Sequence, residues 1–300
     1  MFKTFAEIES HIIRKEINKK VALACAEDEV TLNAVVMAKQ KGLIKPILVG
    51  DVEKIKAILL NLQEELADYE LIAAEDEKTA AELVVQLVKE GSADIPMKGL
   101  MQTSSFMKAI LNKETGLLQG DNLLSQITVL ENNDTGRLFL ISDCAVNITP
   151  GVEEKKKIIS NCIDLAKCLN YENPKVAIIS AVEVVNPKIV STIEAEELTE
   201  FFANDSNATV FGPLALDNAI SKEAAEHKEI INDVAGAADV LIMPDLCSGN
   251  IFSKALTYYT DMLSAGVLAG TCAPVIMTSR TDTLVNKYNA ILMAILQSRK

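Results

Sequence analysis

The chain has 300 residues, of which 49% are hydrophobic and 24% charged, and its formal net charge at pH 7 is −13. This is the composition of a folded globular protein, and the length suits two domains or one large one. Aromatic residues make up only 4% and Trp is absent. Few aromatic rings and an acidic balance together argue against a protein that binds nucleic acid.

The N-terminal segment predicts no targeting signal, because charges occur throughout and an apolar core is missing. An uncharged stretch from Met262 to Ser279 contains Gly266, Gly270 and Pro274, which favours a buried turn between core elements over a membrane span. The six cysteines form no CxxC pair, so we expect reduced core thiols in a cytoplasmic protein. With two isolated histidines, a zinc site or a His-dependent hydrolase is disfavoured.

Short β-branched runs alternate with helical segments through the first third of the chain. The predicted strands are 20–26, 46–50, 70–74 and 93–99, and the predicted helices are 28–41, 52–66, 79–90 and a segment that ends near 112. Alternation of this kind predicts a mostly parallel sheet with right-handed crossovers.

The pattern changes after residues 113–116. Two strand-like runs, 126–130 and 137–141, flank the turn-forming sequence 132–136, which predicts a β-hairpin. Strand–helix alternation then resumes, with helices expected at 152–169, 194–202, 222–231, 251–263 and 284–297, and strands at 176–180, 209–211, 240–243 and 275–277. The second part of the chain therefore gains an antiparallel element that the first part lacks.

Small hydroxyl and amide side chains follow several predicted strands, where open α/β sheets bind their ligands. They occur at 103–105, 142–149, 247–250 and 278–281. Their N–H and O–H groups suit phosphate or carbonyl oxygens. The competing interpretation is that these residues are helix N-caps, which for any single turn is the commoner reason for their presence.

Arg280 is one of four arginines, and two of the others, Arg14 and Arg299, lie in charged terminal segments. It follows the predicted strand 275–277 and is expected to open the last helix, where a cation opposes the helix dipole. That position suggests a bound anion, and a planar guanidinium suits phosphate. The alternative is an ion pair between domains.

Glycine-rich phosphate motifs are missing: the chain contains neither GxGxxG nor GxxxxGK[ST]. Dinucleotide binding of the usual kind and P-loop NTPase activity are therefore both disfavoured. The segment 212–219, in which Pro213 fixes the backbone, is better explained by a turn followed by a helix cap than by a site.

Five longer segments carry a resemblance to a known family. They are ISDCAVNITP (141–150), SAVEVVNPK (180–188), GPLALDNAISKEAAEHK (212–228), ADVLIMPDLCSGNIFSKAL (238–256) and APVIMTSRTDTLVNKYNA (273–290). The chain resembles the phosphate acetyl/butyryltransferase family over nearly its whole length, and most closely its phosphate butyryltransferase branch. The resemblance implies the reaction acyl-CoA + phosphate ⇌ acyl phosphate + CoA, acting on butyryl or branched short-chain acyl groups.

The resemblance also implies an architecture and an assembly. The expected fold class is α/β, with two α/β domains, a cleft between them, and an architecture like that of isocitrate/isopropylmalate dehydrogenases. Residues 1–116 plus 270–300 would form the first domain, and residues 117–269 an inserted second domain. The expected protein is a cytoplasmic homodimer that uses coenzyme A as a substrate, binds acyl-CoA and inorganic phosphate, and needs no metal or permanently bound cofactor, no nucleic acid and no membrane.

The family's Ser-Arg pair after the last strand matches Ser279-Arg280. By resemblance, the serine hydrogen-bonds the CoA thiol and the arginine stabilises phosphate and the developing oxyanion. Where acetyl-specific members carry an Asp as a base, this chain has Asn286, which cannot act as one. Asp282 is the nearest carboxylate in sequence, as a base or only as a helix cap, and local positive charge could instead lower the thiol pKa.

The helix that follows the turn 103–105 carries Lys108 where the family typically has Arg. Lysine keeps the positive charge but cannot bind phosphate through two parallel hydrogen bonds, as a guanidinium does. Lys98, Lys108, Lys254 and Arg280 are candidates for a locally positive site in an acidic chain. The full set of candidate phosphate and CoA contacts is Thr103, Ser104, Lys108, Asn147, Asp245, Ser248, Gly249, Asn250 and Lys254.

Two alternative functions stay open from the sequence. The first is a metal- and NAD-dependent hydroxy-acid dehydrogenase, although we find neither its metal-binding Asp cluster nor its cofactor loop. The second is a non-catalytic protein that binds acyl-CoA or CoA, suggested by the departures from the family pattern at Lys108, Asn286 and Phe211.

Overall fold

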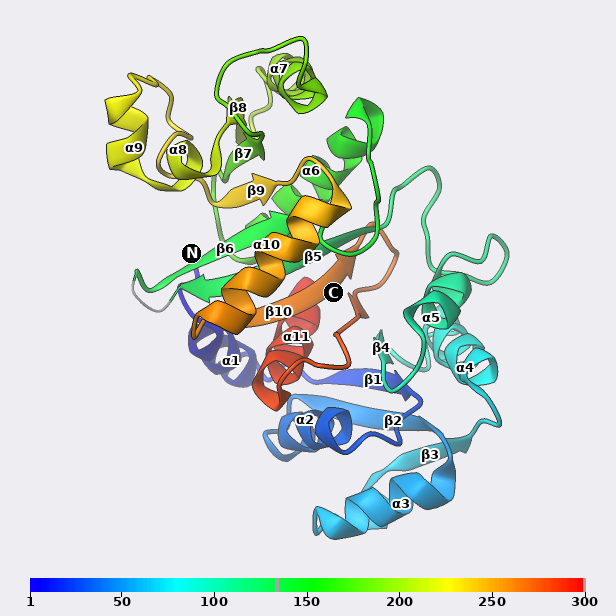
Figure 1. Cartoon of the computed structure of the whole chain (residues 1–300). Coiled ribbons are helices and arrows are strands. Elements are labelled where there is room, and N and C mark those ends of the chain that lie inside the picture. The colour runs from blue at the N-terminus through cyan, green and yellow to red at the C-terminus, as the bar shows by residue number, and fades with distance from the viewer. Residues whose placement is uncertain (133–134, 299–300) are drawn as a thin grey trace. The chain divides into compact units, whose positions relative to one another are not determined.

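The computed structural model of the chain describes residues 1–132 and 135–298 (Figure 1). Part of the predicted turn, residues 133–134, and Arg299 lie outside the described residues. The chain divides into two compact units. Unit 1 comprises residues 1–4 and 123–264, and unit 2 comprises residues 5–122 and 265–300.

Unit 2 contains a mixed sheet with the strand order β3-β2-β1-β4-β11-β10. These strands are β1 (Lys19–Ala24), β2 (Ile44–Gly50), β3 (Glu70–Ala73), β4 (Ile95–Lys98), β10 (Leu263–Ala269) and β11 (Val275–Ile276). The pairs from β3 to β11 are parallel, and β10 pairs antiparallel with β11. The chain runs outward from β1 to β3 and then returns to the other side of β1 as β4, so the carboxyl ends of β1 and β4 form a topological switch point.

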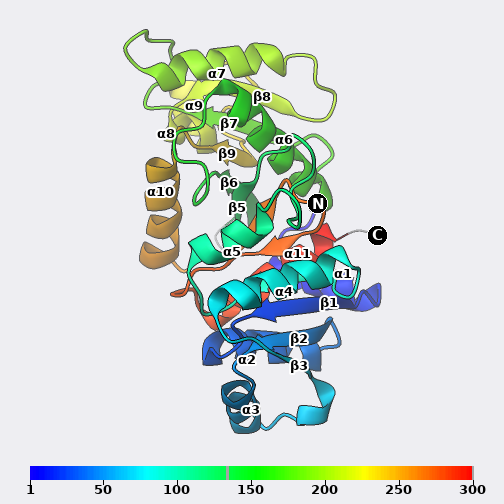
Figure 2. The ribbon, with the colours of Figure 1, turned by 90° about the vertical axis from the view of Figure 1, so that its right-hand side faces the viewer.

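The helices of unit 2 are α1 (Phe5–Arg14), α2 (Glu29–Gln40), α3 (Val52–Asn61), α4 (Glu77–Lys89), α5 (Thr103–Ile110) and α11 (Leu284–Gln297), with a short 3-10 helix at Leu66–Asp68. α11 packs against α1 and α2, while α4 packs against α5 and β1. Figure 2 brings α4 and α5 to the front of this unit. Ten consecutive residues of α11, from Lys287 to Leu296, are buried, so this helix forms the centre of the core of unit 2.

Unit 1 contains a second mixed set of strands in the order β5-β6-β9-β7-β8. They are β5 (Ser125–Asn132), β6 (Arg137–Ser142), β7 (Lys175–Ile179), β8 (Thr209–Leu214) and β9 (Val240–Ile242). β5 and β6 pair antiparallel with Thr128 opposite Ile141, which confirms the predicted hairpin. β6, β9, β7 and β8 pair in parallel, so the prediction of an α/β fold is confirmed.

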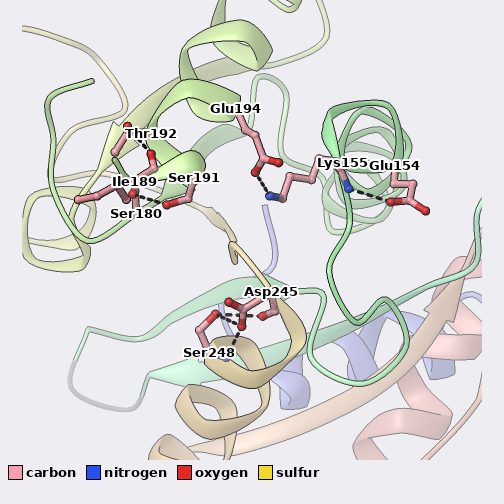
Figure 3. Close-up of polar contacts among 10 residues, drawn as sticks. Glu154, Lys155, Ser180, Ile189, Ser191, Thr192, Glu194, Asp245 and Ser248 are labelled. Carbon is pink, nitrogen blue, oxygen red and sulfur yellow. Dashed lines mark hydrogen bonds and ion pairs between the residues drawn. The ribbon is translucent and has the colours of Figure 1, made fainter. Parts of the chain in front are cut away.

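The helices of unit 1 are α6 (Val152–Cys168), α7 (Val190–Phe201), α8 (Leu216–Ile220), α9 (Lys222–His227) and α10 (Leu246–Tyr259). Lys155 on α6, only 2% exposed, forms an ion pair with Glu194 on α7 (Figure 3). An apolar cluster that includes Leu130, Leu214 and Leu241 fills the interior around these strands.

The structure corrects three sequence-based expectations about elements. Residues 262–279 are not a turn between core elements, since they supply β10 and β11. The glycines and Pro274 in this stretch favoured a turn, but Gly266 lies within β10. α1 was not predicted, and the helix expected at 251–263 begins at Leu246 and ends at Tyr259.

The cysteines only partly match the expectation of core thiols. Cys25, Cys144 and Cys162 are buried, whereas Cys247 and Cys272 are exposed. Within residues 1–132 and 135–298, no group of three His, Cys, Asp or Glu side chains is arranged to hold a metal ion. None of the helices in the described part of the chain is long and apolar enough to cross a bilayer.

Candidate functional site

The switch point of unit 2 brings the end of β4 against the end of β1. Lys98 is the last residue of β4, and Gly99 follows it. A side chain at Gly99 would clash with the carbonyl oxygens of Ala24 and Cys25, so this close approach of two backbones requires glycine. β11 pairs in parallel with β4 through Ile276 and Met97, so the chain leaves both strands at the same edge of the sheet.

The loop 278–283 leaves β11 at this edge and is held by its own hydrogen bonds. The backbone N–H of Ser279 donates to Asp282 Oδ2 over 2.7 Å, and the hydroxyl oxygens of Ser279 and Thr281 lie 3.1 Å apart. Lys287 Nζ donates to the carbonyl oxygen of Ser279 over 2.9 Å and to Thr278 Oγ1 over 3.4 Å. These contacts fix the loop from within unit 2 and leave Ser279 exposed.

Arg280 is exposed, and no carboxylate lies within ion-pair distance of it in the part of the chain that the structure describes. The prediction that it opens the last helix was wrong. α11 begins at Leu284, and its cap is Thr283, whose hydroxyl accepts from the backbone N–H of Asn286 over 3.2 Å. Arg280 therefore belongs to the preceding loop, and the helix-dipole argument does not apply to it.

Two buried lysines lie beside this loop. Lys98 and Lys287 are each 2% exposed. The pKa of Lys98 is lowered to about 8, mainly by burial and also by repulsion from Lys287 and Arg280, while Asp282 and Glu77 act in the opposite direction. Burial also lowers the pKa of Lys287 below its ordinary value. Because an unpaired buried charge is costly, positive charge at this edge favours a bound anion.

α5 begins close to this edge, four residues after Gly99. Its N-cap, Gln102, makes no side-chain capping bond, and the N–H of Gln102 donates to Glu77 Oε2 over 2.9 Å. Thr103 and Ser104 are exposed in the first turn of the helix. Their predicted role in binding phosphate or CoA stays a prediction, but capping by their hydroxyls is not seen among the contacts of the described residues. Lys108 lies exposed in the last turn.

In unit 1, Asn147 lies in the loop that follows β6. Its Nδ2 donates to Leu124 O over 2.9 Å and to Asp143 Oδ2 over 2.6 Å. Asp143 is 3% exposed and also accepts from the N–H groups of Ala145 and Val146 over 2.8 and 2.9 Å. The amide nitrogen of Asn147 is therefore engaged in holding the loop.

The first turn of α10 contains most of the other predicted residues of unit 1. Asp245 caps the helix by accepting from the N–H of Ser248 over 2.8 Å, and the Ser248 hydroxyl donates back to it (Figure 3). Gly249 packs so closely on Asp143 O that a side chain would clash, and Asn250 Nδ2 donates to Cys144 O over 3.0 Å. The cap of α10 is therefore Asp245, which precedes the turn 247–250 for which capping was considered, and Ser248 supplies the N–H that Asp245 accepts.

The predicted residues form one set in each unit. In unit 2, Ser279, Arg280 and Asp282 share a single loop, and Thr103, Ser104 and Lys108 lie on α5. In unit 1, the candidates are Asn147, Asp245, Ser248, Gly249 and Asn250, with Lys254 exposed on α10. Lys287 was missed as a functional residue. A signal was available, since it is the only charged side chain in the segment LVNKYNAILMAILQ of α11.

Comparisons with known proteins identify the family of the chain. The family model "Phosphate acetyl/butaryl transferase" matches residues 6–87 and 73–295. A phosphate butyryltransferase of Clostridium acetobutylicum is 44% identical over 298 residues, which cover 99% of this chain and 98% of that protein.

Solved structures of other proteins share the fold of this chain. The crystal structure of a branched-chain phosphotransacylase from Enterococcus faecalis V583 has a TM-score of 0.82 and 32% identity, covering 93% of this chain and 99% of that one. A 4-hydroxythreonine-4-phosphate dehydrogenase from Klebsiella pneumoniae, at 12% identity and a TM-score of 0.54, covers 94% of this chain and all of that one, and shares the fold alone. The chain belongs to the phosphate acetyl/butyryltransferase family.

Proposed function

We propose that this chain transfers a short acyl group, butyryl or branched, between CoA and inorganic phosphate: acyl-CoA + phosphate ⇌ acyl phosphate + CoA. Family membership makes the protein an acyltransferase. The names of a butyryltransferase relative and of a branched-chain structural neighbour support the choice of acyl group. The observation that carries the proposal is the cluster of Arg280, Lys98 and Lys287 in a chain whose net charge is −13.

The proposed mechanism uses the loop 278–283. The Arg280 guanidinium holds phosphate beside the thioester carbonyl, and positioning of this kind supplies several kcal/mol of the barrier reduction, of order 7 or more in favourable cases. As the C–O bond forms, Arg280 stabilises the oxyanion, and the C–S bond then breaks. The exposed Ser279 hydroxyl is oriented toward the CoA sulfur. Asp282, whose Oδ2 already accepts from the Ser279 N–H, keeps the loop in this geometry.

Several finer features rest on the family resemblance and are part of the proposal. They are a cleft between two domains of the isocitrate/isopropylmalate dehydrogenase type with the boundaries 1–116 plus 270–300 and 117–269, a homodimer, a cytoplasmic location, and the absence of a permanent cofactor. We also propose phosphate or CoA contacts for Thr103, Ser104, Lys108, Asn147, Asp245, Ser248, Gly249, Asn250 and Lys254.

One assay tests the proposal directly. Purified protein is given phosphate with acetyl-CoA, butyryl-CoA or isobutyryl-CoA, and the free CoA thiol is measured. We expect phosphate-dependent release, with kcat/KM higher for butyryl-CoA or isobutyryl-CoA than for acetyl-CoA. Binding of CoA by calorimetry without any phosphorolysis at saturating phosphate would contradict catalysis, and a preference for acetyl-CoA would contradict the assigned acyl group.

A further inference from the structure

The reaction needs a group that donates and accepts a proton at the CoA sulfur, and neither the loop 278–283 nor the first turn of α11 supplies an obvious one. Asn286 cannot exchange a proton. Asp282 uses one carboxylate oxygen on the Ser279 N–H, and an ordinary carboxyl group titrates far below a thiol. The chemistry calls for a group that titrates close to the thiol itself, because proton transfer is most efficient when the two pKa values are matched.

Lys98 is a buried titratable group that the proposed mechanism does not yet use. Its Nζ donates one hydrogen bond, to Gly99 O over 3.3 Å, and in the described part of the chain no carboxylate lies within ion-pair distance of it. A lysine buried for structural reasons is normally paired, because an unpaired buried ammonium is strongly disfavoured. Lys98 lies at the switch point, where open α/β sheets bind their ligands.

The surroundings of Lys98 lower its pKa and so favour the neutral amine. The charged and titratable groups that face it come from the residue after β1, from α4, from the loop after β11 and from α11: Cys25, Glu77, Arg280, Asp282 and Lys287. Two of them are cations, and a second cation next to a buried lysine is a known way of making its amine reactive. Cys25 stays a neutral thiol at working pH, since burial raises its pKa to about 12.

We propose that Lys98 is the acid–base residue of this enzyme, exchanging a proton with the sulfur of CoA, with Lys287 as the neighbouring cation that tunes it. This assignment rests on the proposed phosphate acyltransferase function.

The proton balance is complete without a further reactant. In phosphorolysis, an oxygen of HPO₄²⁻ forms the new C–O bond, the C–S bond breaks, and the Lys98 ammonium gives its proton to the departing thiolate. The Lys98 amine then takes the proton of the attacking phosphate, so that RCO–SCoA + HPO₄²⁻ yields RCO–OPO₃²⁻ + CoASH. In the reverse direction the neutral amine accepts the thiol proton.

The test compares Lys98→Met, which removes charge and proton, with Lys98→Arg, which keeps the charge but cannot titrate in this range. With butyryl-CoA and phosphate, we expect both variants to lose roughly 100-fold or more of kcat, the usual contribution of a positioned acid or base. The KM for phosphate should change much less than kcat. If Lys98→Arg keeps wild-type kcat, or if Lys98→Met raises only the KM for phosphate, Lys98 is a charge for phosphate and the assignment fails.

The pH profile gives an independent readout. In the wild type, log kcat for phosphorolysis should fall above about pH 8, because the Lys98 ammonium is lost, and this limb should be absent in both variants. Glu77 raises the pKa of Lys98, so Glu77→Gln should move the limb to lower pH. A wild-type limb that persists unchanged in Lys98→Met would overturn the assignment.

A substrate with a more acidic leaving group distinguishes loss of proton transfer in Lys98→Met from impaired folding or binding. The butyryl thioester of 4-nitrothiophenol releases a thiolate that needs little protonation, so the deficit of Lys98→Met should shrink at least tenfold with this substrate. An equal deficit with both thioesters would mean that Lys98 acts on folding or binding. If wild-type protein shows no phosphorolysis of any acyl-CoA, the proposed function fails first, and that result is distinguishable from a failure of Lys98 alone.

Thermal unfolding provides the folding control. The folded-state pKa of Lys98, about 8, lies below its ordinary value of 10.5, so the unfolded chain binds the extra proton between these values and wild-type stability rises with pH across this window. Lys98→Met should therefore unfold at a higher temperature than wild type below pH 8, and the difference should shrink toward pH 10.5. A lower unfolding temperature at pH 7 would contradict an unpaired buried ammonium.

Discussion

The loop 278–283 of unit 2 and the start of α10 in unit 1 carry similar small polar residues, but they use them differently. In the loop, Arg280 is exposed and has no carboxylate within ion-pair distance among the described residues. At the start of α10, Asp245 and Ser248 bond each other and cap the helix. Residue type alone therefore does not show which polar side chains already have partners within the fold; that depends on the contacts made in the structure.

The largest expected effect lies in the loop. Arg280→Gln removes the cation proposed to hold phosphate and the oxyanion, and we expect kcat with butyryl-CoA to fall ~100-fold or more, as on loss of one such donor. Arg14→Gln removes another exposed arginine of the same unit, on α1, and should leave kcat unchanged. Equal kcat values for Arg280→Gln and wild type would show that Arg280 holds neither phosphate nor the oxyanion.

A smaller effect, on stability, is expected at α10. Asp245→Ala loses the helix cap, so the free energy of unfolding measured in urea should fall by about 1 kcal/mol. Asp245→Asn keeps a capping oxygen without the charge, and its stability should stay close to that of wild type. If Asp245→Asn is stable but kcat/KM drops strongly, Asp245 contacts substrate in addition to capping the helix.

The smallest effect is expected at Lys108, an exposed cation on α5. Lys108→Arg restores a bidentate fork and should lower the KM for phosphate, whereas Lys108→Gln should raise it. Exposed charges contribute up to about 1 kcal/mol, so each change should be no more than about fivefold. Lys113→Gln removes an exposed lysine of the same unit that has no part in the proposed site, and it should leave the KM for phosphate unchanged. An unchanged KM in both Lys108 variants would remove Lys108 from the site.

The order of strands and helices could be predicted over most of the chain, including the hairpin of β5 and β6 and the last helix, α11. Periodicity reports which face of an element is buried, and so it works where one face is polar. β10 was missed because it contains Gly266 and is followed by Gly270 and Pro274, residues that favour a turn. α1 was missed although its apolar residues Phe5, Ile8 and Ile12 repeat with helical spacing.

The candidate site was predictable only in part. Ser279 and Arg280 were identified from their position after a buried strand and from the family resemblance. Lys98 was a candidate from the sequence, but its proximity to Lys287 could not be predicted, because the two residues are 189 positions apart. Their burial beside one loop depends on the parallel pairing of β4 with β11 and on the packing of α11.

The sequence by itself determined the α/β class and the family, because hydrophobic periodicity and local motifs are properties of contiguous residues. Only the tertiary structure decided which polar side chains cap helices and which stay available. It also decided that Lys98 and Lys287 are buried, and that Lys98 has no carboxylate within ion-pair distance among the described residues. Burial and pairing are set by elements that meet across the sheet, and the pKa of an amine follows from both.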